Sequence, residues 1–142
     1  MEQSAEVDID APSSRVWDVL TDVERWPEWA ETVTSVTRLD EGPLRLSSRV
    51  RVVQPRLPPT EYVVTELSPG QSFTWVAMGT GVRTIARHDV VSLPAGGTRV
   101  RLGVEQAGPL GMVIGRIFFK GLTDRYIAAE AAGLKARSEG TV

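Results

Sequence analysis

Residues 108–137 read GPLGMVIGRIFFKGLTDRYIAAEAAGLKAR. Apolar residues in this stretch recur every three or four positions, which is typical of an amphipathic helix. When Phe118 is placed at the centre of a helical wheel, most of the charged side chains gather on the opposite side. The apolar arc around Phe118 contains Gly111, Ile114, Gly115, Leu122, Tyr126, Ala129, Gly133 and Ala136. We therefore predict one long C-terminal helix whose apolar face requires a partner.

Three residues do not fit this pattern. Arg125 falls inside the apolar arc, so either its aliphatic stem packs while the guanidinium group reaches water, or the cation points into an internal cavity. Ile127 and Leu134 fall on the polar side of the wheel, where a loop or a second subunit would have to cover them. A homodimer, or another protein partner that packs on these two residues, is therefore an open alternative.

The chain between residues 33 and 106 reads as strands, because short runs of alternating residues are separated by turns rich in glycine and proline. Before these runs, the sequence predicts a strand over 4–10, a helix over 12–20 and a second short helix that Pro27 ends or kinks. The predicted fold class is α+β, in a single domain over residues 1–142. A curved antiparallel β-sheet is wrapped around the long C-terminal helix, with two short helices after the first strand.

One helix cannot fill the whole concave face of such a sheet, so the remaining space is a natural ligand cavity. We expect its volume to be roughly 300–1,000 Å³, the usual range for small-molecule sites. The composition agrees with one ordinary globular domain, since 42% of the residues are hydrophobic, 24% are charged and the net charge is −2.

The composition also excludes several kinds of site. No run of basic residues with interleaved aromatic residues occurs, so no nucleic acid partner is expected. One histidine and no cysteine cannot form the common zinc sites, so neither a metal nor a cofactor is expected. The apolar run at 107–119 is shorter than the roughly 20 residues that span a bilayer, which argues against membrane insertion. The first residues, MEQSAE, lack the basic start and apolar core of a signal peptide, so a cytoplasmic protein is expected.

The single histidine, His88, lies on a strand predicted over 82–93. Its face of the strand carries Thr84 and Ala86, whereas the opposite face carries three charged residues, so we expect His88 to point inward. A hydrogen-bonded structural role and a role in ligand chemistry are both open for it. Tyr62 is expected to point into the same space and could pair with His88. The two would then orient one polar group of an apolar ligand, or exchange protons at a ligand carbonyl.

The tryptophans form the third group of candidates. Trp26 and Trp29 flank Pro27 near the expected opening of the cavity, where one of them could be a lid or both could pack. Trp75 is expected in the wall of the sheet. His88 and Tyr62 are the candidate catalytic residues. The residues expected at the ligand site are Trp29, Val52, Gln54, Tyr62, Trp75, Thr84, His88, Phe118, Leu122 and Arg125.

Several motifs resemble those of a known family. They include Val7-Asp8-Ile9-Asp10-Ala11-Pro12, Val16-Trp17, Trp26-Pro27, Val64-Thr65-Glu66-Leu67-Ser68-Pro69-Gly70, Phe73-Thr74-Trp75 and the C-terminal helix. Over nearly its whole length the sequence resembles the START/Bet v 1-like proteins of the SRPBCC superfamily, and within them the polyketide cyclase/dehydrase-like group. This resemblance implies a helix-grip fold. The glycine-rich loop that some members have after the second strand is not matched by Asp40-Glu41-Gly42-Pro43, so no phosphate-binding role is carried over to it.

The resemblance also implies a range of functions, because its members include lipid carriers, metabolite binders and aromatase/cyclases. Our leading hypothesis is the binding of a small hydrophobic ligand, such as a lipid, a polyketide or a similar metabolite, between the sheet and the C-terminal helix. The first alternative is a cofactor-independent cyclase, aromatase or dehydratase that uses acid–base chemistry. The second is a protein-interaction module without a ligand. Fold alone does not decide between them.

Overall fold

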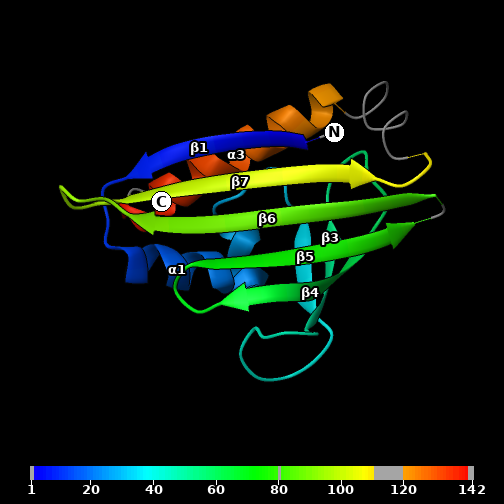
Figure 1. Ribbon diagram of the computed structural model, residues 1–142, viewed down its shortest axis with the longest axis horizontal. Helices are drawn as coiled ribbons and strands as arrows, with labels where there is room; N and C mark the ends of the chain where they lie inside the picture. The colour runs from blue at the N-terminus through cyan, green and yellow to red at the C-terminus, as the bar shows by residue number, and fades with distance from the viewer. Residues whose placement is uncertain (1, 80, 111–119, 141–142) are drawn as a thin grey trace.

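The structure, a computed structural model, describes residues 2–79, 81–110 and 120–140. Within these ranges seven strands form a single curved sheet in the order β1-β7-β6-β5-β4-β3-β2, and every neighbouring pair is antiparallel (Figure 1). The elements are β1 (Glu2–Ile9), α1 (Ser13–Thr21), the 3-10 helix η1 (Val23–Glu28), β2 (Ser35–Arg38), β3 (Arg49–Val53), β4 (Thr60–Ser68), β5 (Ser72–Gly79), β6 (Val82–Ser92), β7 (Thr98–Ala107) and α3 (Lys120–Ser138).

The topology follows from the short connections along the chain. Each strand from β2 to β7 pairs with the next one in sequence, as is typical of an antiparallel meander. The first strand then pairs with the last, with Ile9 opposite Thr98, so α1 and η1 are carried across one face of the sheet. Both α1 and α3 lie behind the sheet in the view of Figure 1, which leaves the other face open to solvent. The predicted α+β class and the predicted order of elements are confirmed.

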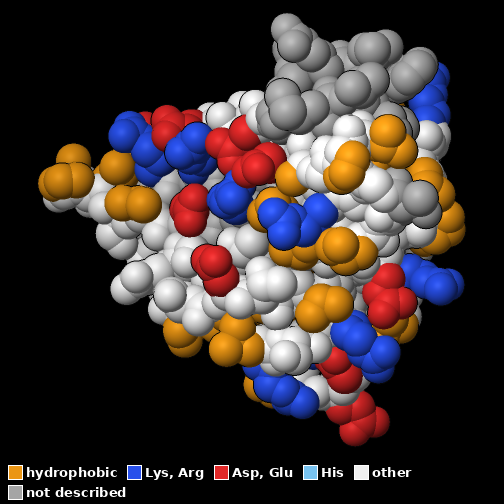
Figure 2. Space-filling model, turned by 45° about the vertical axis from the view of Figure 1, so that its right-hand side comes forward, with side chains coloured by type: hydrophobic (Ala, Val, Ile, Leu, Met, Phe, Trp, Pro, Cys, Tyr) orange, Lys and Arg blue, Asp and Glu red, His pale blue; other side chains and the backbone are white. Residues whose placement is uncertain are grey.

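The outer face of the sheet is covered by alternating charges. Arg87 forms ion pairs with Glu2 and Glu105 at 2.8 and 3.1 Å, and Arg99 pairs with Asp8 at 2.8 Å. Basic and acidic side chains lie side by side over this part of the molecule (Figure 2). These exposed pairs contribute little stability individually, but they keep this face of the sheet in water. The inner face is therefore the one that carries the core.

The core joins the inner face of the sheet to α1, η1 and α3. It is built mostly from valine and aromatic side chains, because inward-facing strand positions favour β-branched and aromatic residues. Its most deeply buried members include Ile9, Val16, Leu20, Val23, Val50, Val64, Phe73, Trp75, Val100, Leu102 and Leu134.

The orientation of α3 differs from the predicted one. Ile127 and Leu134, which were predicted to lie on the polar side, are buried with exposed fractions of 4% and 0%. Ala131 lies between them on the same face, so the spacing i, i+4, i+7 marks the buried stripe. Arg125, predicted within the apolar arc, is exposed. The buried face of the helix is therefore rotated by about half a turn from the face predicted around Phe118. Phe118 itself lies within residues 111–119, which are outside the described residues.

This orientation removes the basis for the hypothesis that a partner subunit packs on Ile127 and Leu134. Ile127 and Leu134 pack in the core of their own chain and offer no surface to a partner subunit. Of the helices that the structure describes, none combines the length and hydropathy needed to cross a membrane.

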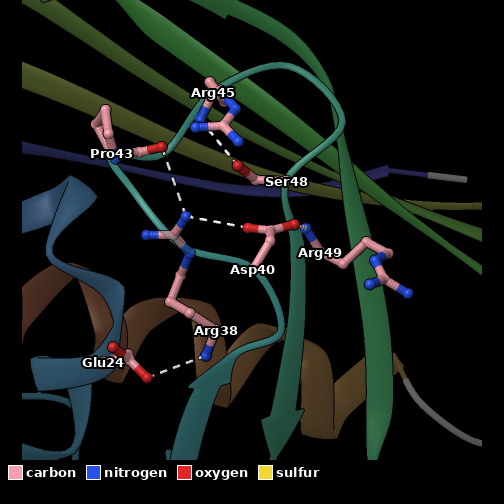
Figure 3. Close-up of polar contacts among 7 residues, drawn as sticks. All are labelled: Glu24, Arg38, Asp40, Pro43, Arg45, Ser48 and Arg49. Atoms are coloured by element: carbon pink, nitrogen blue, oxygen red, sulfur yellow. Dashed lines mark hydrogen bonds and ion pairs between the residues drawn. The ribbon is translucent and has the colours of Figure 1, made fainter.

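A loop after β2 is held by one carboxylate. The Oδ2 atom of Asp40 accepts a hydrogen bond from the backbone N–H of Arg49 at 2.8 Å, and its Oδ1 atom accepts one from the guanidinium group of Arg38 at 3.2 Å (Figure 3). The backbone N–H of Arg38 in turn donates to Glu24 of η1 at 3.0 Å. The hydrogen bond from Arg49, followed by the contact with Arg38, lowers the pKa of Asp40. Asp40 therefore connects the start of β3 to Arg38 at the end of β2, and the backbone N–H of Arg38 makes the separate contact with η1.

Close packing fixes α3 at Gly133. A Cβ atom at this position would lie 2.0 Å from the backbone oxygen of Trp29 and 3.2 Å from its indole ring. The segment that follows η1 is buried at Trp29 and Ala30, so its backbone has no room to retreat. Only glycine permits α3 to approach this closely.

We predict that Gly133→Ala lowers the free energy of unfolding by about 1–3 kcal/mol, as overpacking of a tight contact does. Gly121→Ala is the matched control on the same helix, because a Cβ atom there would meet nothing within 4 Å. It should raise stability by up to about 1 kcal/mol through helix propensity. Urea denaturation of the two variants measures the difference, and equal stabilities would contradict the close contact.

Candidate ligand-binding cavity

A cavity of about 100 Å³ lies between the inner face of the sheet and α3. It is smaller than the 300–1,000 Å³ predicted from the fold. The reason is that the rings of Trp26, Trp75 and Tyr62, with the side chain of Ile127, occupy much of the space under the helix. The lining residues are Trp26, Val33, Val52, Gln54, Leu57, Tyr62, Trp75, Thr84, Ala86, Arg87, His88, Leu102, Gly103, Val104, Gln106, Thr123, Tyr126, Ile127 and Glu130.

A cluster of aromatic rings forms the floor of the cavity. The ring of Trp75 lies 5.3 Å from Trp26 and 5.2 Å from Tyr62, measured between centroids. The indole N–H of Trp26 donates to the backbone oxygen of Leu20 at 2.9 Å, which satisfies this buried donor and fixes the ring. Trp26 and Trp29 are both buried, with ring centroids 5.6 Å apart, so η1 contributes to the core and neither tryptophan is an exposed lid.

His88 points inward, as predicted, and is buried. Its Nδ1 atom is 3.1 Å from the backbone oxygen of Phe73, and its ring stacks on the Phe73 ring with centroids 4.1 Å apart. Because a carbonyl oxygen only accepts, Nδ1 carries the proton in this hydrogen bond, and the Nε2 atom of the neutral ring is an acceptor. Burial lowers the pKa of His88 to about 4, although the hydrogen bond to Phe73 opposes this shift. The imidazole is therefore neutral at pH 7.

Tyr62 also points into the cavity, but it is not paired with His88. Strand β5 lies between their strands, and Trp75 on β5 is in ring contact with both residues. The predicted direct pair of Tyr62 and His88 is therefore wrong. Burial, and then the neighbouring Glu130, raise the pKa of Tyr62 to about 12, so its hydroxyl group keeps its proton and can donate a hydrogen bond.

Glu130 is a cavity residue that sequence reasoning missed. It lies on α3 between Ile127 and Leu134, and burial raises the pKa of its carboxyl group to about 7. The residue as a whole is half-buried, because a side chain that lines a cavity keeps some surface facing the empty space. Among the described residues, its carboxyl group has no hydrogen-bond or ion-pair partner. If Ile127 and Leu134 had been taken to mark the buried face of the helix, the sequence would have predicted that Glu130 points inward.

The predicted ligand residues fall into three groups. Six of them line the cavity: Val52, Gln54, Tyr62, Trp75, Thr84 and His88. Three do not belong to its lining: Trp29, which is buried in the core, Leu122, which is half-buried, and Arg125, which is exposed. The orientation of α3 displaces Leu122 and Arg125, and Trp29 packs against Trp26 in the core without lining the cavity. Phe118 lies outside the described residues.

The part of the chain that the structure describes contains no group of three His, Asp or Glu side chains placed to hold a metal ion. The polar side chains that line the cavity instead carry hydroxyl, amide, imidazole and carboxyl groups, spread over the sheet and α3. Such an arrangement suits the orientation of an organic ligand by a few hydrogen bonds.

The comparisons with known proteins concern both family and fold. The family described as polyketide cyclase/dehydrase and lipid transport matches residues 2–139. A search of curated proteins gives no match. Among solved structures, the Zhui aromatase/cyclase from Streptomyces sp. R1128 superposes with a TM-score of 0.79 at 18% identity, covering 98% of this chain and 93% of that chain. A START superfamily protein from Mycobacterium smegmatis gives a TM-score of 0.73 at 17% identity and covers 99% of both chains.

A third similar structure is a norcoclaurine synthase from Thalictrum flavum, a point mutant in complex with a transition-state analogue. Its TM-score is 0.72 at 12% identity, covering 97% of this chain and 93% of that chain. At these identities the three structures establish the fold, which is the START-type helix-grip arrangement.

The shifted pKa values of His88 and Glu130 predict opposite effects of pH on the free energy of unfolding. Burial lowers the pKa of His88 from 6.5 to about 4, so the stability that the neutral ring contributes is complete above pH 6.5 and is lost as the pH falls to 4. Burial raises the pKa of Glu130 from 4.5 to about 7, so the stability linked to its neutral carboxyl group is complete below pH 4.5 and is lost as the pH rises to 7. Between pH 4.5 and 6.5 the two effects partly cancel.

Single variants should separate them. In that window, Glu130→Gln should make the free energy of unfolding rise more steeply with pH, and His88→Gln should make it rise less steeply or fall. Each change in slope should approach about 1.4 kcal/mol per pH unit, the limit for one proton. Urea denaturation at half-unit pH steps measures the slopes, with exposed Glu66→Gln on β4 as the control. Parallel curves for all four proteins would show that neither group is buried as described.

Proposed function

The chain belongs to the polyketide cyclase/dehydrase and lipid transport family, and we propose that it binds a small, largely apolar molecule in the cavity between the sheet and α3. The observation that carries the proposal is the contrast between the walls and the polar groups of this cavity. The walls are mostly aromatic and aliphatic, whereas the Nε2 atom of His88 and the carboxyl group of Glu130 have no partner among the described residues. A ligand would bury apolar surface against the walls and satisfy one or both of these groups.

The volume limits the size of the ligand. An engineered protein cavity of about 150 Å³ binds benzene, so a space of about 100 Å³ limits the buried group to about one ring at most. A long-chain lipid would require displacement of Trp26, Trp75 or Ile127, each of which is packed in the core. The proposed ligand is therefore a compact molecule, or one whose compact end enters the cavity.

His88 supports binding more than acid catalysis. A general acid has to be protonated at the working pH, and a pKa of about 4 leaves the His88 ring neutral near pH 7. Its hydrogen bond to Phe73 and its stacking on the same residue hold the ring in one orientation. In that orientation Nε2 can accept a hydrogen bond from a ligand hydroxyl or N–H group.

A second candidate function is a cofactor-independent cyclase or dehydratase. It is favoured by Glu130, whose pKa of about 7 is the value that suits a general acid or base near neutral pH. The hydroxyl group of Tyr62, which lines the same cavity, would assist by donating a hydrogen bond to a ligand carbonyl. Turnover of a bound polyketide-like ketone, detected as loss of water, would establish this function over simple binding.

We predict that toluene, used as a neutral probe, binds saturably and shifts the indole N–H resonances of Trp26 and Trp75 in NMR spectra. Ala86→Leu, which adds three carbon atoms to a buried wall residue opposite Trp75, should weaken toluene binding by at least about tenfold, or about 1.4 kcal/mol. Val91→Leu on the exposed face of β6 is the control and should leave the affinity unchanged.

Two results would contradict the proposal. Shifts that never saturate would mean that the cavity does not bind an apolar molecule. Equal affinities of wild type and Ala86→Leu, with both proteins folded by circular dichroism, would place the toluene outside the cavity.

A further inference from the structure

The carboxyl group of Glu130 is placed where a buried acid is costly. Its neighbours on α3 are the core residues Ile127 and Leu134, and it lines the same cavity as Tyr62, whose pKa it helps to raise. A carboxylate in such surroundings normally has an ion-pair partner or hydrogen-bond donors. Glu130 has neither among the described residues, and burial is the single cause of its own pKa shift.

No described side chain supplies a positive charge to this cavity. Arg87 belongs to the lining, but its guanidinium group pairs with Glu2 and Glu105 on the outer face of the sheet. His88 is neutral near pH 7, and Tyr62 is a neutral phenol. The negative charge that Glu130 acquires near neutral pH is therefore uncompensated by any of the lining residues that the structure describes.

Much of the remaining wall is aromatic. Trp26, Trp75, Tyr62 and Tyr126 present aromatic side chains to the same cavity as Glu130. Aromatic faces attract cations, most strongly where water is excluded. A carboxylate beside several aromatic rings is thus complementary to an ammonium group attached to a small apolar body.

We propose that the ligand of this cavity carries a protonated amine, with Glu130 as its counter-ion. The inference rests on the proposed binding function and adds the chemical class of the ligand. A neutral hydroxyl group would offer one hydrogen bond and leave the charge of Glu130 buried. An ammonium group offers up to three N–H donors and neutralises that charge.

The proposal predicts a preference between matched probes. Benzylamine and toluene share a ring and differ by the amino group, and benzyl alcohol is the neutral polar control. Wild-type protein at pH 7.5 should bind benzylamine at least about tenfold more tightly than toluene or benzyl alcohol, as a buried charge pair does. The indole N–H resonances of Trp26 and Trp75 report the binding of all three.

The variant Glu130→Gln keeps the shape of the side chain and removes its charge. It should abolish the preference, with benzylamine binding reduced at least about tenfold and toluene binding changed by less than about twofold. Glu66→Gln, which removes an exposed carboxyl group on β4, should leave both affinities unchanged. In wild type, the affinity for benzylamine should fall by up to about tenfold per pH unit below pH 7, as Glu130 becomes protonated.

The possible failures are distinguishable. If toluene binds but benzylamine binds no better, or if Glu130→Gln retains the preference, the amine inference is overturned while the binding function stands. If none of the three probes binds, both are overturned. Loss of benzylamine and toluene binding together in a folded Glu130→Gln variant would make Glu130 a part of the cavity wall rather than a counter-ion, which also overturns the inference.

Discussion

The packing of α3 on the concave face of the sheet, beside α1 and η1, is the contact from which most features of this protein follow. Ile127, Ala131 and Leu134 are buried on the side of α3 that faces the core. Because Gly133 has no side chain, the backbone of α3 can approach the segment after η1 closely. Because α3 is held this close at Gly133, the space beneath it cannot be large. The indole of Trp26 then fills part of what remains, and a narrow cavity is left.

The strands were predictable because their signals are local. Alternation of period two sorted His88, Tyr62 and Trp75 to the inner face, and the structure places all three there. A bulge in β4 between Val64 and Glu66 shifts the register, but it falls after Tyr62 and leaves the orientation of that residue intact. The strands predicted over 4–10 and 82–93 end within two residues of β1 and β6.

The presence of the C-terminal helix was predicted correctly, but the prediction of its buried face was wrong. The predicted apolar face was centred on Phe118, in an apolar run that precedes the described part of α3. The same face was assumed to hold along the whole helix. Alanine gives little help in such a choice, since Ala128 and Ala132 are exposed whereas Ala131 is buried. The widely spaced large residues Ile127 and Leu134 decide the phase, because burying them releases more apolar surface from water than burying alanine does. This one error displaced Leu122 and Arg125 from the predicted site and hid Glu130.

The cavity combines three titratable groups whose charges respond differently to the same burial. Desolvation favours the neutral form of each group, so His88 loses its proton readily and Tyr62 and Glu130 retain theirs. Of these three, only Glu130 has a pKa close to 7. Its protonation state is therefore coupled to the ligand that enters the cavity. A cationic ligand would favour the ionised carboxylate, and a ligand carbonyl would favour the protonated carboxyl group. The same carboxyl group can serve a binder or an enzyme, and the charge of the ligand decides which of its two forms is used.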